Sequence, residues 1–379
     1  MDFALNETHQ MIRETARNFA AGRVAPGSVE RDEREEFPHD IVKELGELGF
    51  MGMMVPEEWG GAGLDTISYV IAMEEISRVD ASVGVIMSVN NSLVCFGLEK
   101  YGTREQKERY LRDLAMGKKL GAFALSEPEA GSDASNQRTT AVRDGDAYIL
   151  NGTKNWITNG STADYVLVMA ATDRSKGPKG ISAFIVEKGA AGFAVAKKEK
   201  KLGIRSSDTV SLSFADCRIP ATNRIGEEGD GFTFAMKTLE GGRIGIAAQA
   251  LGIGQASLDA SVRYAKERKA FDRFIAEFQA IQFKLADMAT NIEAARLLTL
   301  QAAYLKDAGK PFGKEASMAK VFASKVAVEA ALEAIQIHGG YGYVREYLVE
   351  RYLRDAKITE IYEGTSEIQR IVVSRALLR

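Results

Sequence analysis

Residues 123–133 read Phe123-Ala124-Leu125-Ser126-Glu127-Pro128-Glu129-Ala130-Gly131-Ser132-Asp133, and the periodicity of the chain changes at this segment. Before it, apolar residues recur at helical spacing, and Asn6 is placed to cap the first helix. After it, apolar and β-branched residues stand in short runs that are typical of strands. The segment therefore predicts a helical domain over residues 1–120, followed by a β domain over residues 121–228.

Several strands are predicted within the β domain. Residues 165–169 and 181–186 are apolar runs, whereas residues 210–214 alternate apolar and polar side chains, as a half-buried strand does. Asp144-Gly145 and Asn151-Gly152 stand between such runs, and both dipeptides are typical of tight hairpin turns. These patterns predict a sheet that contains hairpins.

Residues 229–379 return to a helical composition, rich in Ala, Leu, Glu, Lys and Gln. One helix is marked by apolar residues at spacings of three and four: Phe278, Ile281, Leu285, Met288, Ile292 and Ala295. Gly309-Lys310-Pro311 is expected to end this helix. The predicted fold class is α+β multidomain, with an N-terminal helical domain, a middle β-sheet domain and a C-terminal helical bundle.

The composition excludes several classes of protein. The chain has 379 residues, of which 45% are hydrophobic and 27% are charged, and its formal net charge is -3. This balance argues against a nucleic-acid-binding protein, because such proteins carry a basic surface. No run of 18 apolar residues predicts a membrane span, and the N-terminus does not resemble a secretory signal. We therefore expect a cytoplasmic enzyme or binding protein.

Metal sites and disulfides are not expected. Cys95 and Cys217 are far apart in the sequence, which argues against a disulfide framework or a cysteine zinc cluster. His9, His39 and His338 are also scattered. The residues that usually bind metals therefore form no recognisable group.

The usual sequence motifs for binding nucleotides or catalytic zinc are absent as well. The chain has no GxxxxGK[ST] phosphate loop and no HExxH zinc motif. Gly252-Ile253-Gly254 begins like a dinucleotide fingerprint, but no strand precedes it, so we favour close packing between helices. A nucleotide cofactor, if present, must be held in another way.

Two segments of the middle domain each have two interpretations. Residues 123–133 place small and hydroxyl side chains around Gly131, which suits either a surface turn or a backbone that approaches a phosphate or a ring. Trp156 stands at a strand end beside Thr158. It either lies against a planar cofactor, with Thr158 donating a hydrogen bond, or fills the core.

A third segment, residues 361–370, contains Glu363 in the loop before a predicted helix. Ser366 and Gln369 fit a capping box at the start of that helix. Glu363 is then either a solvated acid near the helix N-terminus or a general base on a short turn that reaches into a pocket.

With these motifs the sequence resembles the acyl-CoA dehydrogenase family over essentially its whole length, and the short-chain, butyryl-CoA type in particular. The motifs are residues 123–133, Trp156-Ile157-Thr158, Arg268-Lys269-Ala270-Phe271 with Gln279, Gln336-Ile337-His338-Gly339-Gly340, and Tyr362-Glu363-Gly364-Thr365-Ser366-Glu367-Ile368-Gln369-Arg370. Each motif is moderately specific, and the combination is strong. The resemblance implies the fold of that family, with a barrel-like middle domain and a C-terminal four-helix bundle.

The resemblance also implies non-covalently bound FAD between the middle domain and the C-terminal helices. The residues implied around the flavin and its ribityl chain are Phe123, Leu125, Ser126, Gly131, Ser132, Trp156, Ile157 and Thr158. The residues implied to reach the FAD of a neighbouring subunit are Arg268, Gln279, Gln336, Gly339 and Gly340. Thr365 and Glu367 are implied near the adenosine part. The expected assembly is a homotetramer built as a dimer of dimers.

By the same resemblance, Glu363 removes a proton from the α carbon of an acyl-CoA thioester. The β hydrogen leaves as hydride to the flavin, which gives a trans-2-enoyl-CoA, and the electrons pass to electron-transfer flavoprotein. The main-chain N–H of Glu363 and a ribityl hydroxyl of FAD are implied as donors to the thioester oxygen. Ser132, Glu240, Arg243 and Gly364 are implied to contact the CoA part.

Three positions bear on the subfamily. Isovaleryl- and long-chain-type relatives carry the base at the position of Gly242, and glutaryl-CoA dehydrogenases carry an arginine at the position of Gly84. A short monocarboxylic acyl group is therefore expected, although the chain length stays open. His338, where the family often has leucine, is interpreted as a packing change near the FAD phosphates.

Three alternatives to a short-chain dehydrogenase follow from the same resemblance. They are a branched short-chain or medium-chain dehydrogenase, an oxidase-like flavoprotein that reacts with O₂, and a non-catalytic binding protein. The length of the chain disfavours the oxidase, since such oxidases are usually much longer, and Glu363 disfavours the binding protein. The lack of a targeting segment predicts a bacterial, cytoplasmic enzyme.

Overall fold

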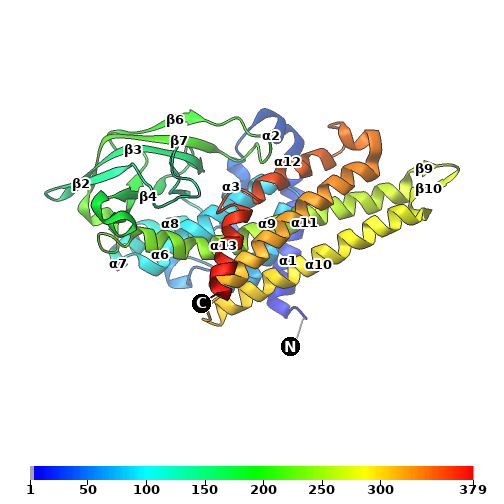
Figure 1. The fold of residues 1–379 in the computed structure, drawn as a ribbon, viewed down its shortest axis with the longest axis horizontal. Coiled ribbons are helices and arrows are strands. Elements are labelled where there is room, and N and C mark those ends of the chain that lie inside the picture. Colours follow the sequence, from blue (N-terminus) through cyan, green and yellow to red (C-terminus); the bar gives the residue numbers. More distant parts are fainter. Residues whose placement is uncertain (1–3, 379) are drawn as a thin grey trace.

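The computed structural model describes residues 4–378 and has the predicted order of a helical, a β and a second helical part (Figure 1). The sheet lies at one end of the molecule, at the upper left of Figure 1, and the long C-terminal helices extend from there to the opposite end. The predicted boundaries at residues 120 and 228 lie in connections between elements.

The N-terminal part consists of short helices. Its described residues form α1 (Glu7–Phe19), α2 (Ser28–Arg34), α3 (His39–Glu47), α4 (Thr66–Ser77), α5 (Ala81–Ser88), α6 (Phe96–Tyr101), α7 (Arg104–Gln106) and α8 (Arg112–Ala115). The predicted cap of α1 is confirmed, because the Asn6 side chain accepts a hydrogen bond from the His9 N–H at 2.8 Å. Asp65 caps α4 and Asp80 caps α5 in the same way.

One helix of this part has the length and composition of a membrane span. α5 continues through the π-helical segment Val89–Cys95 into α6, and residues 81–101 have a mean hydropathy of 1.5. Protein surrounds this helix, since 94% of its apolar window is buried. Its Asn90 side chain donates to the Met51 carbonyl at 2.8 Å. Burial in the protein core therefore accounts for its apolar composition.

The β part is one sheet of eight strands. These are β1 (Gly121–Ala124), β2 (Thr140–Asp144), β3 (Ala147–Thr158), β4 (Tyr165–Ala171), β5 (Ile181–Glu187), β6 (Phe193–Lys198), β7 (Thr209–Pro220) and β8 (Arg224–Ile225). Neighbouring strands follow the order β6-β7-β3-β2-β4-β5-β8, and β1 pairs with β4 in parallel. Tyr148 and Leu212 from one half pack in the same core as Val168 and Phe184 from the other half. The strands predicted at residues 165–169, 181–186 and 210–214 are confirmed.

Only one of the two predicted hairpin turns is present. Asp144-Gly145 lies in the turn between β2 and β3. The prediction for Asn151-Gly152 is wrong, because both residues lie inside β3, where the register against β7 shifts. A Cβ atom at Gly152 would lie 2.5 Å from Thr139 Oγ1, and Gly152 has a φ of 147°. An irregularity in the strand and a close contact, not a turn, require this glycine.

The C-terminal part is helical, with one small hairpin. Its elements are α9 (Gly231–Glu267), β9 (Lys269–Ala270), β10 (Arg273–Phe274), α10 (Gln279–Asp307), α11 (Gly313–His338), α12 (Val349–Thr359) and α13 (Ser366–Leu377). The predicted apolar stripe belongs to α10, which begins one residue after Phe278, and Gly309 follows its end with a φ of 65°. Gly252 confirms the packing interpretation, because a Cβ there would lie 2.5 Å from the Glu74 carbonyl oxygen.

The three parts of the molecule share a hydrophobic core. Leu93 from the N-terminal part, Leu167 and Ile185 from the sheet, and Phe234 and Leu251 from α9 belong to one cluster of buried side chains. α9 also packs against α4, α10 and α11. A site next to α9 can therefore receive residues from all three parts of the chain.

Candidate active site

Glu363 lies on a tight turn between α12 and α13. Glu363 has a φ of 53° and Gly364 a φ of 93°, so two consecutive residues adopt the left-handed region. The Gln369 side chain donates to the carbonyl of Glu363 at 3.2 Å and to that of Gly364 at 2.9 Å. These bonds hold the turn in a conformation that is otherwise costly for a glutamate.

The predicted capping box at the start of α13 is wrong. Thr365, not Ser366, is the N-cap, and its side-chain oxygen accepts a hydrogen bond from the Ile368 N–H at 3.4 Å. Ser366 is the first residue of the helix. The Gln369 side chain does not reach back to cap the helix, since it binds the carbonyls of the Glu363 turn instead.

The Glu363 carboxylate points into the protein, against α9. Its Oε2 atom is buried and has no hydrogen-bond partner among residues 4–378. A Cβ atom at Gly242 would lie 2.1 Å from this oxygen and 2.8 Å from Leu93 Cδ2, so α9 leaves room for the carboxylate only because residue 242 is glycine. The solvated-acid interpretation of Glu363 is therefore wrong.

The charges around Glu363 suit a proton acceptor. Burial raises the pKa of Glu363 to about 7, while the cations Lys320 and Arg243 act in the opposite direction. Lys320 is fully buried on α11 and donates to the Gly364 carbonyl at 2.6 Å. Because this carboxylate changes protonation near neutral pH, it can take a proton and later release it.

Several polar neighbours of Glu363 were not predicted from the sequence. Tyr362 donates a hydrogen bond to the Gln249 side chain of α9, and the buried Tyr69 of α4 donates to Ser88 at 3.1 Å. Lys320 was missed as well. Its only signal in the sequence is that a lysine stands among the small and apolar residues 316–323, a pattern that a solvated helix face also produces.

The residues implied in CoA binding fall in different places. Gly364 adjoins Glu363, and Glu240 is half-buried one turn before Arg243 on α9. Burial lowers the pKa of the Arg243 guanidinium, and the carboxylates of Glu240 and Glu363 oppose this effect. Arg243 donates to Ser317 at 3.2 Å. This arginine is placed to act on the Glu363 charge, whereas Ser132 is exposed on the connection between β1 and β2.

The residues implied around the flavin lie on β1, β3 and the connection after β1. Phe123, Leu125 and Ile157 are buried, Ser126 and Thr158 are half-buried, and Gly131 and Ser132 are exposed. Trp156 is 56% exposed and has a φ of 60°, so the interpretation as a core tryptophan is wrong. A Cβ at Gly131 would meet nothing within 4 Å. The surface therefore offers an aromatic face and open backbone to a planar ligand.

A buried ion pair lies next to this surface. Lys154 of β3 donates to Glu127 Oε1 at 2.7 Å and to the Leu125 carbonyl at 3.1 Å. Glu127 also accepts from the N–H groups of Arg138 at 2.5 Å and Thr139 at 3.1 Å. Although burial opposes them, Lys154 and these donors hold the pKa of Glu127 below its ordinary value. The pair joins β3 to the connection after β1.

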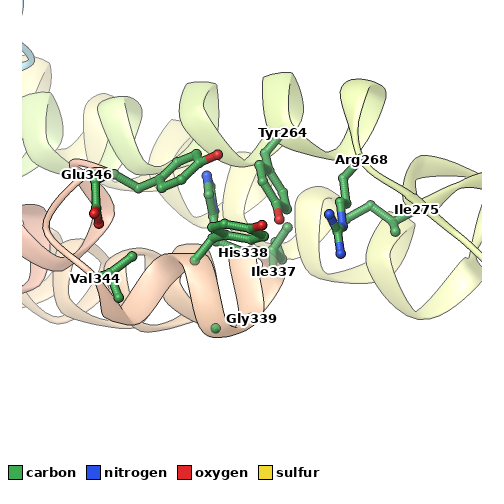
Figure 2. Close-up of a pocket in the computed structure, with 11 residues that line it drawn as sticks. Tyr264, Arg268, Ile275, Ile337, His338, Gly339, Val344 and Glu346 are labelled. Carbon is green, nitrogen blue, oxygen red and sulfur yellow. The ribbon is translucent and has the colours of Figure 1, made fainter.

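Three of the five residues implied to reach a neighbouring FAD line a cavity, shown in Figure 2. This cavity has a volume of about 810 Å³, and Arg268, Gly339 and Gly340 line it. A Cβ at either glycine would meet nothing within 4 Å, so the backbone is open to a ligand. Gln336, near the end of α11, and Gln279, at the start of α10, are exposed.

His338 lines this cavity as part of an aromatic stack (Figure 2). Its ring stacks on Tyr264 with 4.2 Å between the centroids and meets Tyr347 edge-on at 5.6 Å. Its Nδ1 atom lies 2.7 Å from the Ala334 carbonyl oxygen. Burial lowers the pKa of His338, which leaves the ring neutral at pH 7. This arrangement favours the interpretation of His338 as a packing residue.

The residues present fit a dinucleotide cofactor in two separate groups. The group on the sheet offers the exposed Trp156, and the group at the other end of the bundle offers Arg268 and two open glycines, which suit a pyrophosphate. The first group lies on β3, and the second lies where α9 and α11 end. Within residues 4–378, no group of three His, Cys, Asp or Glu side chains is arranged to hold a metal ion.

Gly84, which bears on the substrate, is packed too closely to carry a side chain. A Cβ at this position would lie 2.1 Å from Ser77 Oγ. An arginine would therefore not fit here without a rearrangement of α4 and α5. Residues 86–93, at the end of α5 and in the π-helical segment after it, are all buried.

Known proteins resemble this chain along its whole length. The short-chain specific acyl-CoA dehydrogenase of Clostridium acetobutylicum is 51% identical, with 100% of both chains covered. The structure of butyryl-CoA dehydrogenase from Megasphaera elsdenii has a TM-score of 0.99 at 49% identity, again with 100% of both chains covered. A chain in a structure described as "Electron transferring flavoprotein of Acidaminococcus fermentans: Towards a mechanism of flavin-based electron bifurcation" has a TM-score of 0.99 at 54% identity and the same coverage.

One of these comparisons overturns an argument made from the sequence. The prolyl acyl carrier protein oxidase AnaB has a TM-score of 0.96 at 36% identity, and the match covers 99% of this chain and 100% of that one. An oxidase of this length therefore exists on the same fold, so the length of the chain does not exclude one.

The family assignment rests on three domain profiles that match in succession. They are the N-terminal, middle and C-terminal domains of acyl-CoA dehydrogenase, and they match residues 6–118, 122–217 and 229–378. Together with full-length relatives at about half identity, they settle the question that the sequence motifs raised. The chain belongs to the acyl-CoA dehydrogenase family.

Proposed function

We propose that this protein catalyses the α,β-dehydrogenation of a short-chain acyl-CoA to a trans-2-enoyl-CoA, with Glu363 as the general base. One observation carries the proposal. The Glu363 carboxylate is buried with no hydrogen-bond partner on Oε2, and burial raises its pKa to about 7. Such a carboxylate takes a weakly acidic carbon-bound proton more readily than a solvated one. The short-chain relatives support the substrate class.

The protein residues divide the work as follows. Glu363 takes the α proton, and its neutral form no longer bears the cost of a buried charge. Lys320 and Arg243 favour the ionised form before the transfer. The main-chain N–H of Glu363 has no acceptor among residues 4–378, so it is free to donate to the thioester oxygen, where negative charge develops.

We infer that FAD is the cofactor. Trp156 and Thr158 would hold its ring system, while Arg268, Gly339 and Gly340 of a second copy would hold its pyrophosphate. When bound, FAD supplies the acceptor for the β hydrogen, which leaves as hydride. We propose the homotetramer of the family as the assembly, in which the second group belongs to a neighbouring copy. Thr365 and Glu367, at the start of α13, would adjoin the adenosine part.

Electron-transfer flavoprotein is the proposed electron acceptor. The similar chain solved in a study of an electron transferring flavoprotein supports this partner. The bacterial relatives support a cytoplasmic location in a bacterium. The competing oxidase reading predicts that the reduced enzyme is reoxidised by O₂ as fast as by the flavoprotein. Stopped-flow reoxidation with each acceptor separates the two, and we expect O₂ to be the slower.

The substrate range is tested by kcat/KM across straight-chain acyl-CoA thioesters from butyryl to octanoyl, with branched short-chain analogues included. We expect the highest value with butyryl-CoA and a fall of about tenfold or more for the longest chains, since one methylene is worth about 1–3 kcal/mol in a tight apolar pocket. A maximum at octanoyl-CoA would identify a medium-chain enzyme, and a maximum with a branched substrate would identify the branched-chain alternative.

The catalytic assignment is tested with two measurements on the purified protein. The visible spectrum should show flavin absorption, and a colourless protein that cannot be reconstituted with FAD would leave only the non-catalytic alternative. Glu363→Gln should retain FAD and bind acyl-CoA but lose most turnover. Wild-type rates in that variant would place the base elsewhere.

A further inference from the structure

We propose that Lys320 is a positioning residue for the reaction: its ammonium group holds the turn that carries Glu363 and supplies the cation next to the carboxylate. The inference rests on the proposed role of Glu363 as the base. Lys320 is 0% exposed, and its Nζ donates to the Gly364 carbonyl at 2.6 Å, one residue after Glu363. A buried lysine is rare unless it has a specific partner, and here that partner is the catalytic turn.

Lys320 belongs to a row of buried polar side chains on one face of α11. Ser317, Lys320 and Ser324 are separated by three and four residues, and each is 0% exposed. Ser324 donates to the Thr359 carbonyl at 2.8 Å, where α12 ends. Ser317 accepts a hydrogen bond from Arg243 at 3.2 Å. The same face of α11 thus holds both sides of the turn, as well as the second cation near Glu363.

The charged and titratable groups that face Glu363 come from every element around it. Lys320 approaches from α11 and Arg243 from α9, while Tyr69 of α4 and Tyr362 of the turn are phenols that stay neutral, because burial raises the pKa of both above its ordinary value. Lys320 is first among the cations that favour the ionised Glu363.

Lys320 differs from Arg243 in its contacts, and this difference assigns it the positioning role. Among residues 4–378, Arg243 bonds only to a serine of α11, whereas Lys320 bonds directly to the backbone of the turn. Burial lowers the pKa of Lys320 to about 8, and Glu363 is the first group that opposes this shift. The amine therefore stays charged at neutral pH, and loss of its charge would raise the pKa of the Glu363 carboxylate.

The test compares four variants of the FAD-loaded enzyme. Lys320→Met removes the charge and the hydrogen bond, and Lys320→Arg keeps a charge in different geometry. Ser324→Ala removes a bond to the last residue of α12, which precedes the turn, without changing any charge. Lys325→Met is the matched control, because Lys325 lies on the same helix but is exposed, and its ion pair is with Glu329 at 3.6 Å, one turn further along α11. The pH profile of kcat/KM is measured for each, together with flavin content and thermal unfolding.

In the wild-type enzyme, kcat/KM should rise with pH through a midpoint near 7, where Glu363 loses its proton. In Lys320→Met this midpoint should move up by about one unit or more, because a cation that favours the carboxylate is gone. The limiting kcat should also fall about 10- to 100-fold through misplacement of the turn. Lys320→Arg should restore the midpoint but only part of kcat. Ser324→Ala should lower kcat without a shift, and Lys325→Met should match the wild type.

A second readout does not depend on turnover. The carboxyl C=O band that distinguishes the wild type from Glu363→Gln in infrared difference spectra should titrate at the same midpoint as activity and shift with it in Lys320→Met. An unchanged midpoint in folded Lys320→Met, by both methods, overturns the inference even if kcat falls. That result leaves the proposed function intact, which fails only if Glu363→Gln retains wild-type turnover.

Discussion

Glu127 and Glu363 are both glutamates with buried carboxyl groups near a buried lysine, yet the protein treats them in opposite ways. Glu127 binds Lys154 at 2.7 Å and accepts two main-chain N–H groups, which hold its pKa below the ordinary value. Glu363 has a buried Oε2 with no partner, and burial raises its pKa to about 7. Lys320 approaches it but donates to the Gly364 carbonyl instead of to the carboxylate.

The difference lies in how the hydrogen-bonding capacity of each carboxylate is used. A carboxylate whose oxygens are all bound stays ionised and joins two elements, as Glu127 joins β3 to the connection after β1. A carboxylate with a free buried oxygen is costly in its charged form, and it gains when it takes a proton. Burial of an acid therefore identifies a base only when its oxygens lack partners.

The largest expected effect on turnover comes from substitution of Glu363, whose carboxylate has the free oxygen. Glu363→Gln should lower kcat by about 10²- to 10⁴-fold, the contribution typical of a general base. Its free energy of unfolding should not fall, because the amide removes a buried charge. Single-turnover flavin reduction by butyryl-CoA measures the first effect and urea unfolding the second. If Glu363→Gln lost stability but kept its turnover, Glu363 would have the structural role that we assign to Glu127.

Exchange of the other glutamate should damage the fold. Glu127→Gln leaves the Lys154 ammonium buried without its counter-ion, which should cost about 3 kcal/mol of unfolding free energy. The enzyme that remains folded and loaded with FAD should turn over at rates near those of the wild type. In the double variant with Lys154→Met the cost should be smaller than the sum of the single changes, and additivity would show that the two residues do not interact.

The next largest effect on kcat is expected from filling the space beside Glu363 Oε2 that Gly242 leaves open. In Gly242→Ala the added methyl carbon would lie 2.1 Å from Glu363 Oε2, so the carboxylate would have to move. We expect kcat to fall about 10- to 100-fold while FAD stays bound. Gly254→Ala on the same helix is the matched control, because its methyl group would meet Ile292 only at 3.5 Å. Equal kcat values for both variants would mean that Glu363 can lie elsewhere.

The titration of the free carboxylate sets the pH dependence of activity. Because the base acts when ionised, kcat/KM should fall about tenfold per unit as the pH drops below about 7, and it should level off above this value. Glu127, whose pKa is lowered, should contribute no titration in this range. A rate that stays constant down to pH 5 would show that the base has an ordinary carboxyl pKa.

The smallest effect concerns the helix that follows the turn. Thr365→Ala removes the N-cap of α13 and should cost about 1 kcal/mol of stability, whereas loss of the Ser366 hydroxyl should not change the cap. Thermal unfolding of both variants measures this. A greater loss in Ser366→Ala would restore the capping box predicted from the sequence.

The sequence was sufficient for the order of the three parts, because helical and strand periodicities differ over long stretches. It was insufficient where the same local pattern fits two different structures. Gly152 carries a hairpin pattern but lies at an irregularity within β3, and Gln369 fits a capping box but binds the turn before the helix. Gly152 is required by its close approach to Thr139, and Gln369 bonds to carbonyls five and six residues before it. Neither contact follows from the spacing of residue types alone.

The candidate base could be named from its motif, but its environment could not. Lys320 contributes a cation from 43 residues before Glu363, and it stands in a helical pattern that gives no sign of the partner. Apart from that motif, the two acids look alike in the sequence, since Glu127 stands beside a proline and Glu363 beside a glycine. Only the folded chain shows which oxygen atoms have partners.

Gly242 also bears on how this protein could change in evolution. The structure gives one volume to either a side chain at position 242 or the carboxylate of Glu363. A lineage that moved the base to position 242 would have to lose Glu363 at nearly the same time. The first change alone would crowd the existing base, and the second alone would leave none. The two arrangements are thus separated by intermediates of reduced activity, and the glycine at position 242 shows which arrangement the present chain has.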